Sequence, residues 1–162
     1  EAERIPTLAE TIGLMNGRLG LNIEIKSGGR SRPFHEIIDR CIAIVRNHRA
    51  SSLVLYSSFQ HRYIEYLKRS YPDMRVGYLY HAIRIPRQPV QKEAQRQRTD
   101  YLVVSSRGLR TRFVERAHAE GLLVGAFTVN TPRQLARAVH LGVDAIFTDD
   151  PAGIRNTLNA MK

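Results

Sequence analysis

Short apolar runs alternate with segments of helical character along the whole chain, and they do so about six times. The runs that we predict as strands are residues 21–26, 53–56, 74–80, 101–104, 123–127 and 144–147. A segment with helical spacing or helix-start signals follows each of them, and no shift in composition divides the sequence. Neighbouring parallel strands need a crossover connection, which is usually a helix. The pattern therefore predicts an α/β fold with a parallel sheet, in a single domain that spans residues 1–162.

Helix-start signals support this division of the chain. Thr7 and Glu10 have the spacing of a capping box, which predicts a helix to about Met15. Ser31 and Pro33 open the next helical segment, and Ser57 or Ser58 is expected to cap the helix over residues 60–70. Later helices are predicted at 89–98, 111–120, 132–140 and from Pro151 onward.

Two parallel α/β architectures remain open on these grounds. Residues 27–30 read Ser-Gly-Gly-Arg and lack the glycine spacing of a dinucleotide-binding turn, which counts against a doubly wound sheet. A (β/α)8 barrel usually takes about 250 residues. The six units predicted here would fall about two units short of closing one.

The strand at residues 21–26 carries an unusual row of polar side chains. Asn22, Glu24 and Lys26 alternate with apolar residues, so they share one face of the strand. In a barrel this row would face the interior near the carboxyl end of the strand, where barrel active sites lie. Glu24 would suit Mg²⁺ or Ca²⁺, and Lys26 would suit a phosphate oxygen. The alternatives are a buried Glu24–Lys26 pair and a solvated edge strand.

Other reactive residue types have ordinary structural interpretations. His81 directly follows a predicted strand, but we assign it to a loop and not to catalysis. Asp150 stands before Pro151 at a helix start, which indicates a helix cap and not a metal pair with Asp149. Cys41 is the one cysteine and lies in an apolar helical pattern, which favours a place in the core.

The net charge of +10, from 25 Lys and Arg against 15 Asp and Glu, favours anionic partners in general. Nucleic acid, an anionic membrane surface and a phosphate-bearing substrate all fit. We do not expect nucleic acid, because no aromatic residues interleave the basic stretches and no nucleic-acid motif is present. No apolar run approaches the roughly 20 residues that span a bilayer.

Five short segments, in order along the chain, resemble signatures of the glycerophosphodiester phosphodiesterase family. They are Ile5-Pro6-Thr7-Leu8-Ala9-Glu10, Leu21-Asn22-Ile23-Glu24-Ile25-Lys26, Ser57-Ser58-Phe59, Phe127-Thr128-Val129-Asn130 and Gly142 to Pro151. The resemblance implies a (β/α)8 TIM barrel of the phosphodiesterase type, incomplete here, with about six units that correspond to strands 3–8. It also implies a metal-dependent phosphoric diester hydrolase that converts glycerophosphodiesters to glycerol 3-phosphate and an alcohol.

The same resemblance implies roles for three residues. Glu24 matches a metal-binding glutamate, with Mg²⁺ or Ca²⁺ as the expected ion, and Lys26 matches a lysine near the substrate phosphate. Phe127 stands where the family usually has a tryptophan beside the substrate, and Asn130 closes that motif or caps the following helix.

No catalytic residue is assigned in this chain. The family's His-Arg-Gly motif, its other metal-binding acids and its second histidine precede the Ile5–Glu10 segment, so we expect the chain alone to be inactive. The alternative is a non-catalytic phosphate-binding or interaction module. Two strand edges would be open in such a partial barrel, so we expect either that a second copy or a swapped partner completes it or that the first two units lie outside this sequence. Cytoplasmic and membrane-associated locations both remain open, the latter through a region that precedes the sequence.

Overall fold

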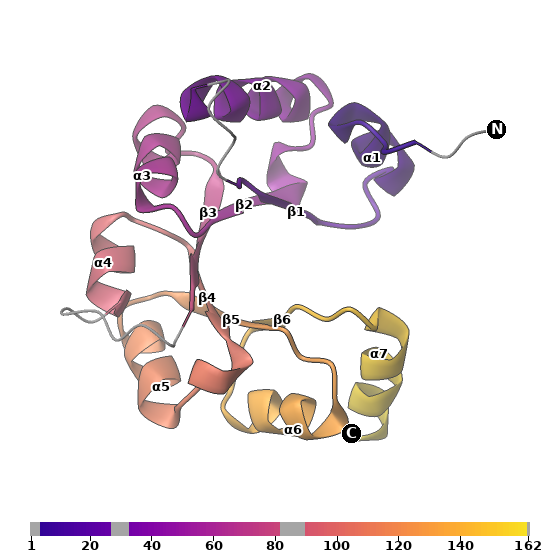
Figure 1. Ribbon diagram of the computed structural model, residues 1–162, viewed down its shortest axis with the longest axis vertical. Coiled ribbons are helices and arrows are strands. Elements are labelled where there is room, and N and C mark those ends of the chain that lie inside the picture. Colours follow the sequence, from indigo (N-terminus) through magenta and orange to yellow (C-terminus); the bar gives the residue numbers. More distant parts are fainter. Residues whose placement is uncertain (1–3, 27–32, 82–89, 162) are drawn as a thin grey trace. The chain divides into compact units, whose positions relative to one another are not determined.

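The computed structural model describes residues 4–26, 33–81 and 90–161. The described α-helices are α1 (Leu8–Met15), α2 (Phe34–Asn47), α3 (His61–Ser70), α4 (Val90–Arg96), α5 (Thr111–Ala119), α6 (Pro132–His140) and α7 (Pro151–Ala160). The strands are β1 (Leu21–Glu24), β2 (Val54–Ser58), β3 (Arg75–Tyr80), β4 (Tyr101–Ser105), β5 (Leu123–Phe127) and β6 (Ala145–Ile146). Short 3-10 helices, η1 (Ser51–Leu53) and η2 (Ser106–Gly108), flank β2 and β4. The predicted alternation of strands and helices is confirmed (Figure 1).

The chain divides into two compact units, Glu1–Val76 and Gly77–Lys162. In the first unit β1 pairs with β2 in parallel, with Leu21 opposite Val54 and Glu24 opposite Ser57. In the second unit β3, β4, β5 and β6 pair in parallel and in chain order. That the chain is one domain stays a prediction.

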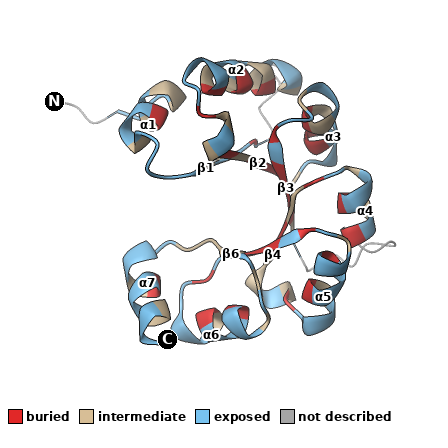
Figure 2. Ribbon diagram, turned by 180° about the vertical axis from the view of Figure 1, so that it is seen from behind, coloured by how far each residue is buried: buried red, intermediate tan, exposed pale blue. Residues whose placement is uncertain are grey.

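Apolar helix faces and the strands supply the core of each unit. Ile38 and Val45 of α2 and Ile64 of α3 are fully buried in the first unit, as are Leu102 of β4 and Val124 of β5 in the second. Figure 2 shows β2 to β5 buried along most of their length, whereas the helices are buried on one side only. Burial on this pattern is the main stabilising contribution in an α/β fold.

Two of the predicted helix starts are confirmed. The Thr7 hydroxyl accepts a hydrogen bond from the Glu10 amide (3.3 Å), and the Glu10 carboxylate accepts one from the Thr7 amide (2.8 Å). Before α7, the Asp150 carboxylate accepts from the Gly153 amide at 2.9 Å, with Pro151 in the first turn. The helix-cap interpretation of Asp150 is therefore correct.

The start of α3 differs from the prediction. Gln60, and neither serine, is the cap residue of α3, and its side chain makes no capping bond. The Ser58 hydroxyl still accepts from the Gln60 amide at 3.1 Å, so it contacts the backbone ahead of the helix. Pro33 immediately precedes α2, as predicted, while Ser31 lies outside the described residues.

The first and last strands are shorter than predicted. β1 ends at Glu24, not at residue 26, because the ladder continues by only one bond, from the Ile25 amide to the Ser57 carbonyl (2.7 Å). The carbonyl of Ile25 then accepts from the Ser58 side chain in place of a backbone amide. β6 is limited to Ala145–Ile146, although the amides of Asp144 and Phe147 also bond to β5 (2.8 Å each).

In the part of the chain that the structure describes, no helix has the length and apolar character needed to cross a membrane.

Candidate functional site

Glu24 is the last residue of β1, and the register of the strands shows which face it occupies. Ile23 pairs with Tyr56 of β2. Burial raises the pKa of the Tyr56 hydroxyl, and the Cys41 thiol of α2 raises it further, so the Tyr56 side chain faces the helices. Paired residues in a parallel sheet share a face, and side chains alternate along a strand. Glu24 therefore lies on the face opposite the helices, at the carboxyl end of the strand.

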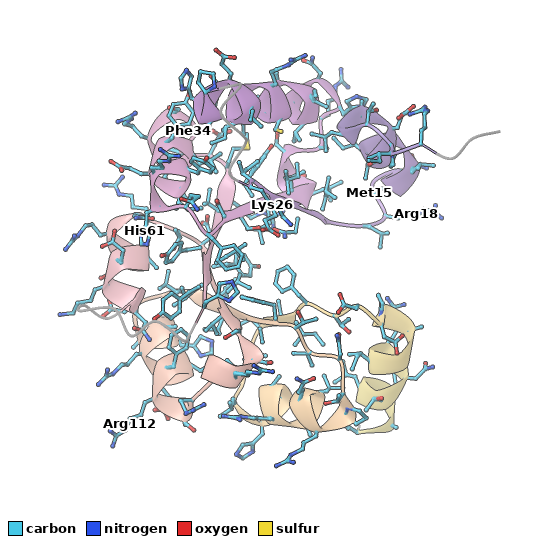
Figure 3. The ribbon with its side chains drawn as sticks, viewed as in Figure 1. Met15, Arg18, Lys26, Phe34, His61 and Arg112 are labelled. Atoms are coloured by element: carbon cyan, nitrogen blue, oxygen red, sulfur yellow. The ribbon has the colours of Figure 1, made fainter. Side chains whose placement is uncertain are left out.

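Lys26 lies two residues beyond Glu24 and close to it. Its ammonium is 4.0 Å from the Glu24 carboxylate, and the side chains are 78% and 34% exposed respectively. Figure 3 shows Lys26 beside the end of β1 and away from α2. A buried ion pair is therefore the wrong interpretation of this motif. A pair this exposed adds little to stability, which leaves both groups available to a ligand.

Two serines end β2 next to these charges, and both are fully buried. The Ser58 hydroxyl donates to the Ile25 carbonyl (2.7 Å) and accepts from the Gln60 amide (3.1 Å), which fixes the backbone between Glu24 and Lys26. The Ser57 hydroxyl is buried with no hydrogen-bond partner among the described residues. Ser57 is the register partner of Glu24, so it shares that residue's face of the sheet.

These two serines should respond oppositely to replacement by alanine. Ser58→Ala leaves a buried carbonyl and amide without partners, and we expect it to lower the free energy of unfolding by about 1–3 kcal/mol. Ser57→Ala removes a buried hydroxyl that has no partner, and we expect no loss of stability but a gain of up to about 1–3 kcal/mol, the desolvation penalty of that group. Urea denaturation of the two variants measures the difference. Equal losses would show that Ser57 has a bond that this arrangement does not contain.

Phe127, the third predicted site residue, lies in the second unit at the carboxyl end of β5. Burial raises the pKa of Tyr78 to about 12, and the Glu93 carboxylate of α4 adds to the rise, so Tyr78 faces the helices. The next residue, Leu79, therefore lies on the opposite face of the sheet. Leu79 is paired with Val103 of β4, and Val103 is paired with Gly125 of β5, so all three share that face. Phe127, two residues after Gly125, lies on this same face.

Glycine at position 125 makes room for a neighbouring ring on this face. A Cβ at Gly125 would lie 3.1 Å and 3.2 Å from the two methyl groups of Val103, and 3.3 Å from the ring of Phe147. The His81 ring also meets Phe127 edge-on, with 5.5 Å between centroids and 78° between planes. Sequence reasoning placed His81 in a loop after the strand, but it did not anticipate this contact. The sequence feature that could have indicated this contact is the position of His81 directly after β3.

Asn130 connects the loops that follow β5 and β6. Its amide nitrogen donates to the Asp149 carboxylate (2.6 Å), and its carbonyl oxygen accepts from the Thr148 hydroxyl (3.1 Å) and the Asp149 amide (2.9 Å). The expectation that Asn130 caps the next helix is wrong. Thr131 caps α6 through a capping box with Gln134.

The described residues include oxygen atoms that could contribute to a hard-cation site. Glu24 supplies a half-exposed carboxylate oxygen at a strand end, and the unpartnered Ser57 hydroxyl is its register partner. A carboxylate oxygen fits Mg²⁺ or Ca²⁺. Among residues 4–26, 33–81 and 90–161, no three His, Cys, Asp or Glu side chains gather as a complete ligand set. Glu24 and Lys26 belong to the first unit and Phe127 to the second, and each is described within its own unit.

Comparison with known proteins finds glycerophosphodiester phosphodiesterases that resemble this chain. Residues 1–153 match the model of the glycerophosphoryl diester phosphodiesterase family. A glycerophosphodiester phosphodiesterase of Caldanaerobacter subterraneus is 30% identical over 157 residues, which are 95% of this chain and 62% of that protein. One of Bacillus altitudinis is 27% identical over 153 residues, or 93% of this chain and 61% of the relative. The chain thus spans about three fifths of the length of these curated relatives.

A solved structure extends the likeness to the fold. An Oleispira antarctica phosphodiesterase, in complex with the product sn-glycerol-3-phosphate, is 27% identical and has a TM-score of 0.83, covering 95% of this chain and 61% of that one. The prediction of an α/β fold of the phosphodiesterase barrel type is confirmed by this match together with the parallel strands.

Proposed function

The chain belongs to the glycerophosphoryl diester phosphodiesterase family, and we propose on that premise that the whole protein hydrolyses glycerophosphodiesters to glycerol 3-phosphate and an alcohol. The observation that carries the proposal is the family match, which runs through residues 1–153 and includes Glu24, Lys26 and Phe127. The relatives named above are phosphodiesterases, and one of them holds glycerol 3-phosphate as its product.

We propose that Glu24 contributes one oxygen ligand to a divalent cation, Mg²⁺ or Ca²⁺, at the carboxyl end of β1. Such an ion supplies Lewis acidity toward a phosphodiester oxygen when it is bound. The position of Glu24 on the face opposite the helices supports this role, as does the exposure of its carboxylate. Oxygen ligands from outside the described residues would complete the set.

Lys26 is proposed to bind a phosphate oxygen of the substrate. Its ammonium is a compact charge on a flexible stem and is largely exposed, so it can reach a bound phosphate from the strand end. Phe127 is proposed to cover the substrate with its ring. Its neighbour His81 lies against that ring and would limit how it turns.

Proton transfer to the leaving alcohol needs a general acid that we do not assign within residues 1–162. One carboxylate and one lysine do not supply an acid–base pair, so we propose that this segment by itself has little activity. Completion of the barrel by another copy and contact with a membrane surface are further proposals that rest on the basic charge and the partial fold.

The test is turnover of sn-glycero-3-phosphocholine and sn-glycero-3-phosphoethanolamine by the whole protein, with released glycerol 3-phosphate measured by a coupled dehydrogenase. We expect release with Mg²⁺ or Ca²⁺ present and its loss after treatment with EDTA. A protein that binds glycerol 3-phosphate but turns over neither diester with any divalent cation would instead be a non-catalytic phosphate-binding module.

A further inference from the structure

Ser57 is one of two adjacent buried serines, and the two differ in what their hydroxyls do. Ser58 uses its hydroxyl twice, toward Ile25 and toward Gln60. The Ser57 hydroxyl has no partner in the described part of the chain. A buried hydroxyl without a hydrogen bond costs roughly 1–3 kcal/mol of stability, so we expect this hydroxyl to form a hydrogen bond in some state of the protein.

The register partner of Ser57 in β1 is Glu24, whose carboxylate can accept a hydrogen bond. The two residues are directly paired, and paired strands run about 4.8 Å apart. Staggered rotamers of the serine and of the longer glutamate side chain can turn the hydroxyl and the carboxylate toward each other.

In the structure described here, the Glu24 carboxylate is directed elsewhere. Its Oε1 lies 4.0 Å from the Lys26 ammonium, in a pair that solvent screens. When one oxygen of the carboxylate binds a cation, the cation offsets the negative charge and weakens the attraction to the Lys26 ammonium. The second oxygen can then accept a hydrogen bond from a hydroxyl. Groups that hydrogen-bond to a ligating carboxylate fix its orientation.

We propose that the Ser57 hydroxyl donates a hydrogen bond to the Glu24 carboxylate when that carboxylate binds a divalent cation. Ser57 is then a positioning residue, which acts on the cation through Glu24. The inference rests on the proposed function, because it takes Glu24 as a ligand. It also assigns Lys26 two partners in turn, the Glu24 carboxylate without the cation and a substrate phosphate with it.

The test measures cation affinity apart from turnover. The whole protein, stripped with EDTA, is titrated with Mg²⁺ alone and with Ca²⁺ alone by calorimetry. Ser57→Ala should raise the Kd by about 10–100-fold, the usual effect of losing a group that orients a metal ligand. Ser57→Thr retains a hydroxyl and should stay close to wild type. The matched control is Ser52→Ala, which replaces an exposed serine of η1, before the amino end of β2, and should leave the Kd unchanged.

Urea denaturation of the cation-free variants accompanies the titration, because a structural role would appear there as lost stability. If Ser57→Ala does not fold, Ser57→Cys, similar in size and a weak donor, takes its place. An unchanged Kd for the variant overturns the inference. Wild-type protein that hydrolyses the diesters yet binds no cation overturns it and leaves hydrolysis standing. Cation binding weakened by Ser57→Ala, in a protein without turnover, supports the inference and counts against the proposed function.

Discussion

Replacing Glu24 with alanine in the whole protein should abolish cation-dependent release of glycerol 3-phosphate. Groups that merely orient a metal ligand are worth about 10–100-fold, so loss of a ligand itself should cost at least about a hundredfold in kcat/KM. Glu24→Gln should be nearly as inactive, because it keeps the shape and loses the charge. The free energy of unfolding should change little, since the carboxylate is half-exposed and its ion pair with Lys26 is weak.

A matched control separates this result from a general effect of removing acidic groups. Glu36 is an exposed carboxylate in the first turn of α2, so it belongs to the same unit but to the helix layer. Glu36→Ala should retain wild-type turnover. If Glu24→Ala releases glycerol 3-phosphate at the wild-type rate and keeps its dependence on Mg²⁺ or Ca²⁺, Glu24 is not a ligand.

Much of the fold could be predicted from local patterns, because they report directly on burial and capping. The alternation at Leu21, Ile23 and Ile25 identifies the covered face of β1, and the spacing of Thr7 and Glu10 identifies the start of α1. Strand ends were less predictable. β1 stops at Glu24 because a side chain from another strand, Ser58, bonds to the Ile25 carbonyl, and no local pattern encodes that partner.

The candidate site could likewise be predicted from the sequence only in part. Period-2 alternation placed Glu24 and Lys26 on one face, and the family resemblance singled out Phe127. Which of two neighbouring serine hydroxyls is bonded depends on tertiary contacts, so the motif at positions 57 and 58 could not separate them.

Asn130 and Thr131 illustrate the limit of capping rules. Both residue types cap helices well, and both stand just before Pro132. The capping box with Gln134 belongs to Thr131, while Asn130 bonds to the loop after β6, which is distant in sequence. Choosing between them requires knowing that β5 and β6 are neighbours.

Replacing Lys26 with alanine should lower turnover by about 10–1,000-fold, the range for losing one preorganised contact to developing negative charge. The proposed contact is with a phosphate oxygen, which is negatively charged in the substrate and gains further negative charge as the nucleophile attacks the phosphorus. We therefore expect both a raised KM and a lowered kcat, in contrast to Glu24→Ala, which should act mainly on kcat. Initial rates across a series of sn-glycero-3-phosphocholine concentrations give both constants.

Lys26→Arg tests whether charge alone is sufficient at this position. An arginine keeps the positive charge but presents a planar fork in place of a compact ammonium, so partial recovery is expected. Arg18→Ala, which removes an exposed cation from the segment before β1, should leave both constants unchanged.

Cation affinity provides the decisive comparison. Because Lys26 lies 4.0 Å from the Glu24 carboxylate and competes for it, Lys26→Ala should bind Mg²⁺ at least as tightly as wild type while it turns over substrate more slowly. Weaker Mg²⁺ binding in Lys26→Ala would mean that the lysine supports the cation site and does not bind phosphate.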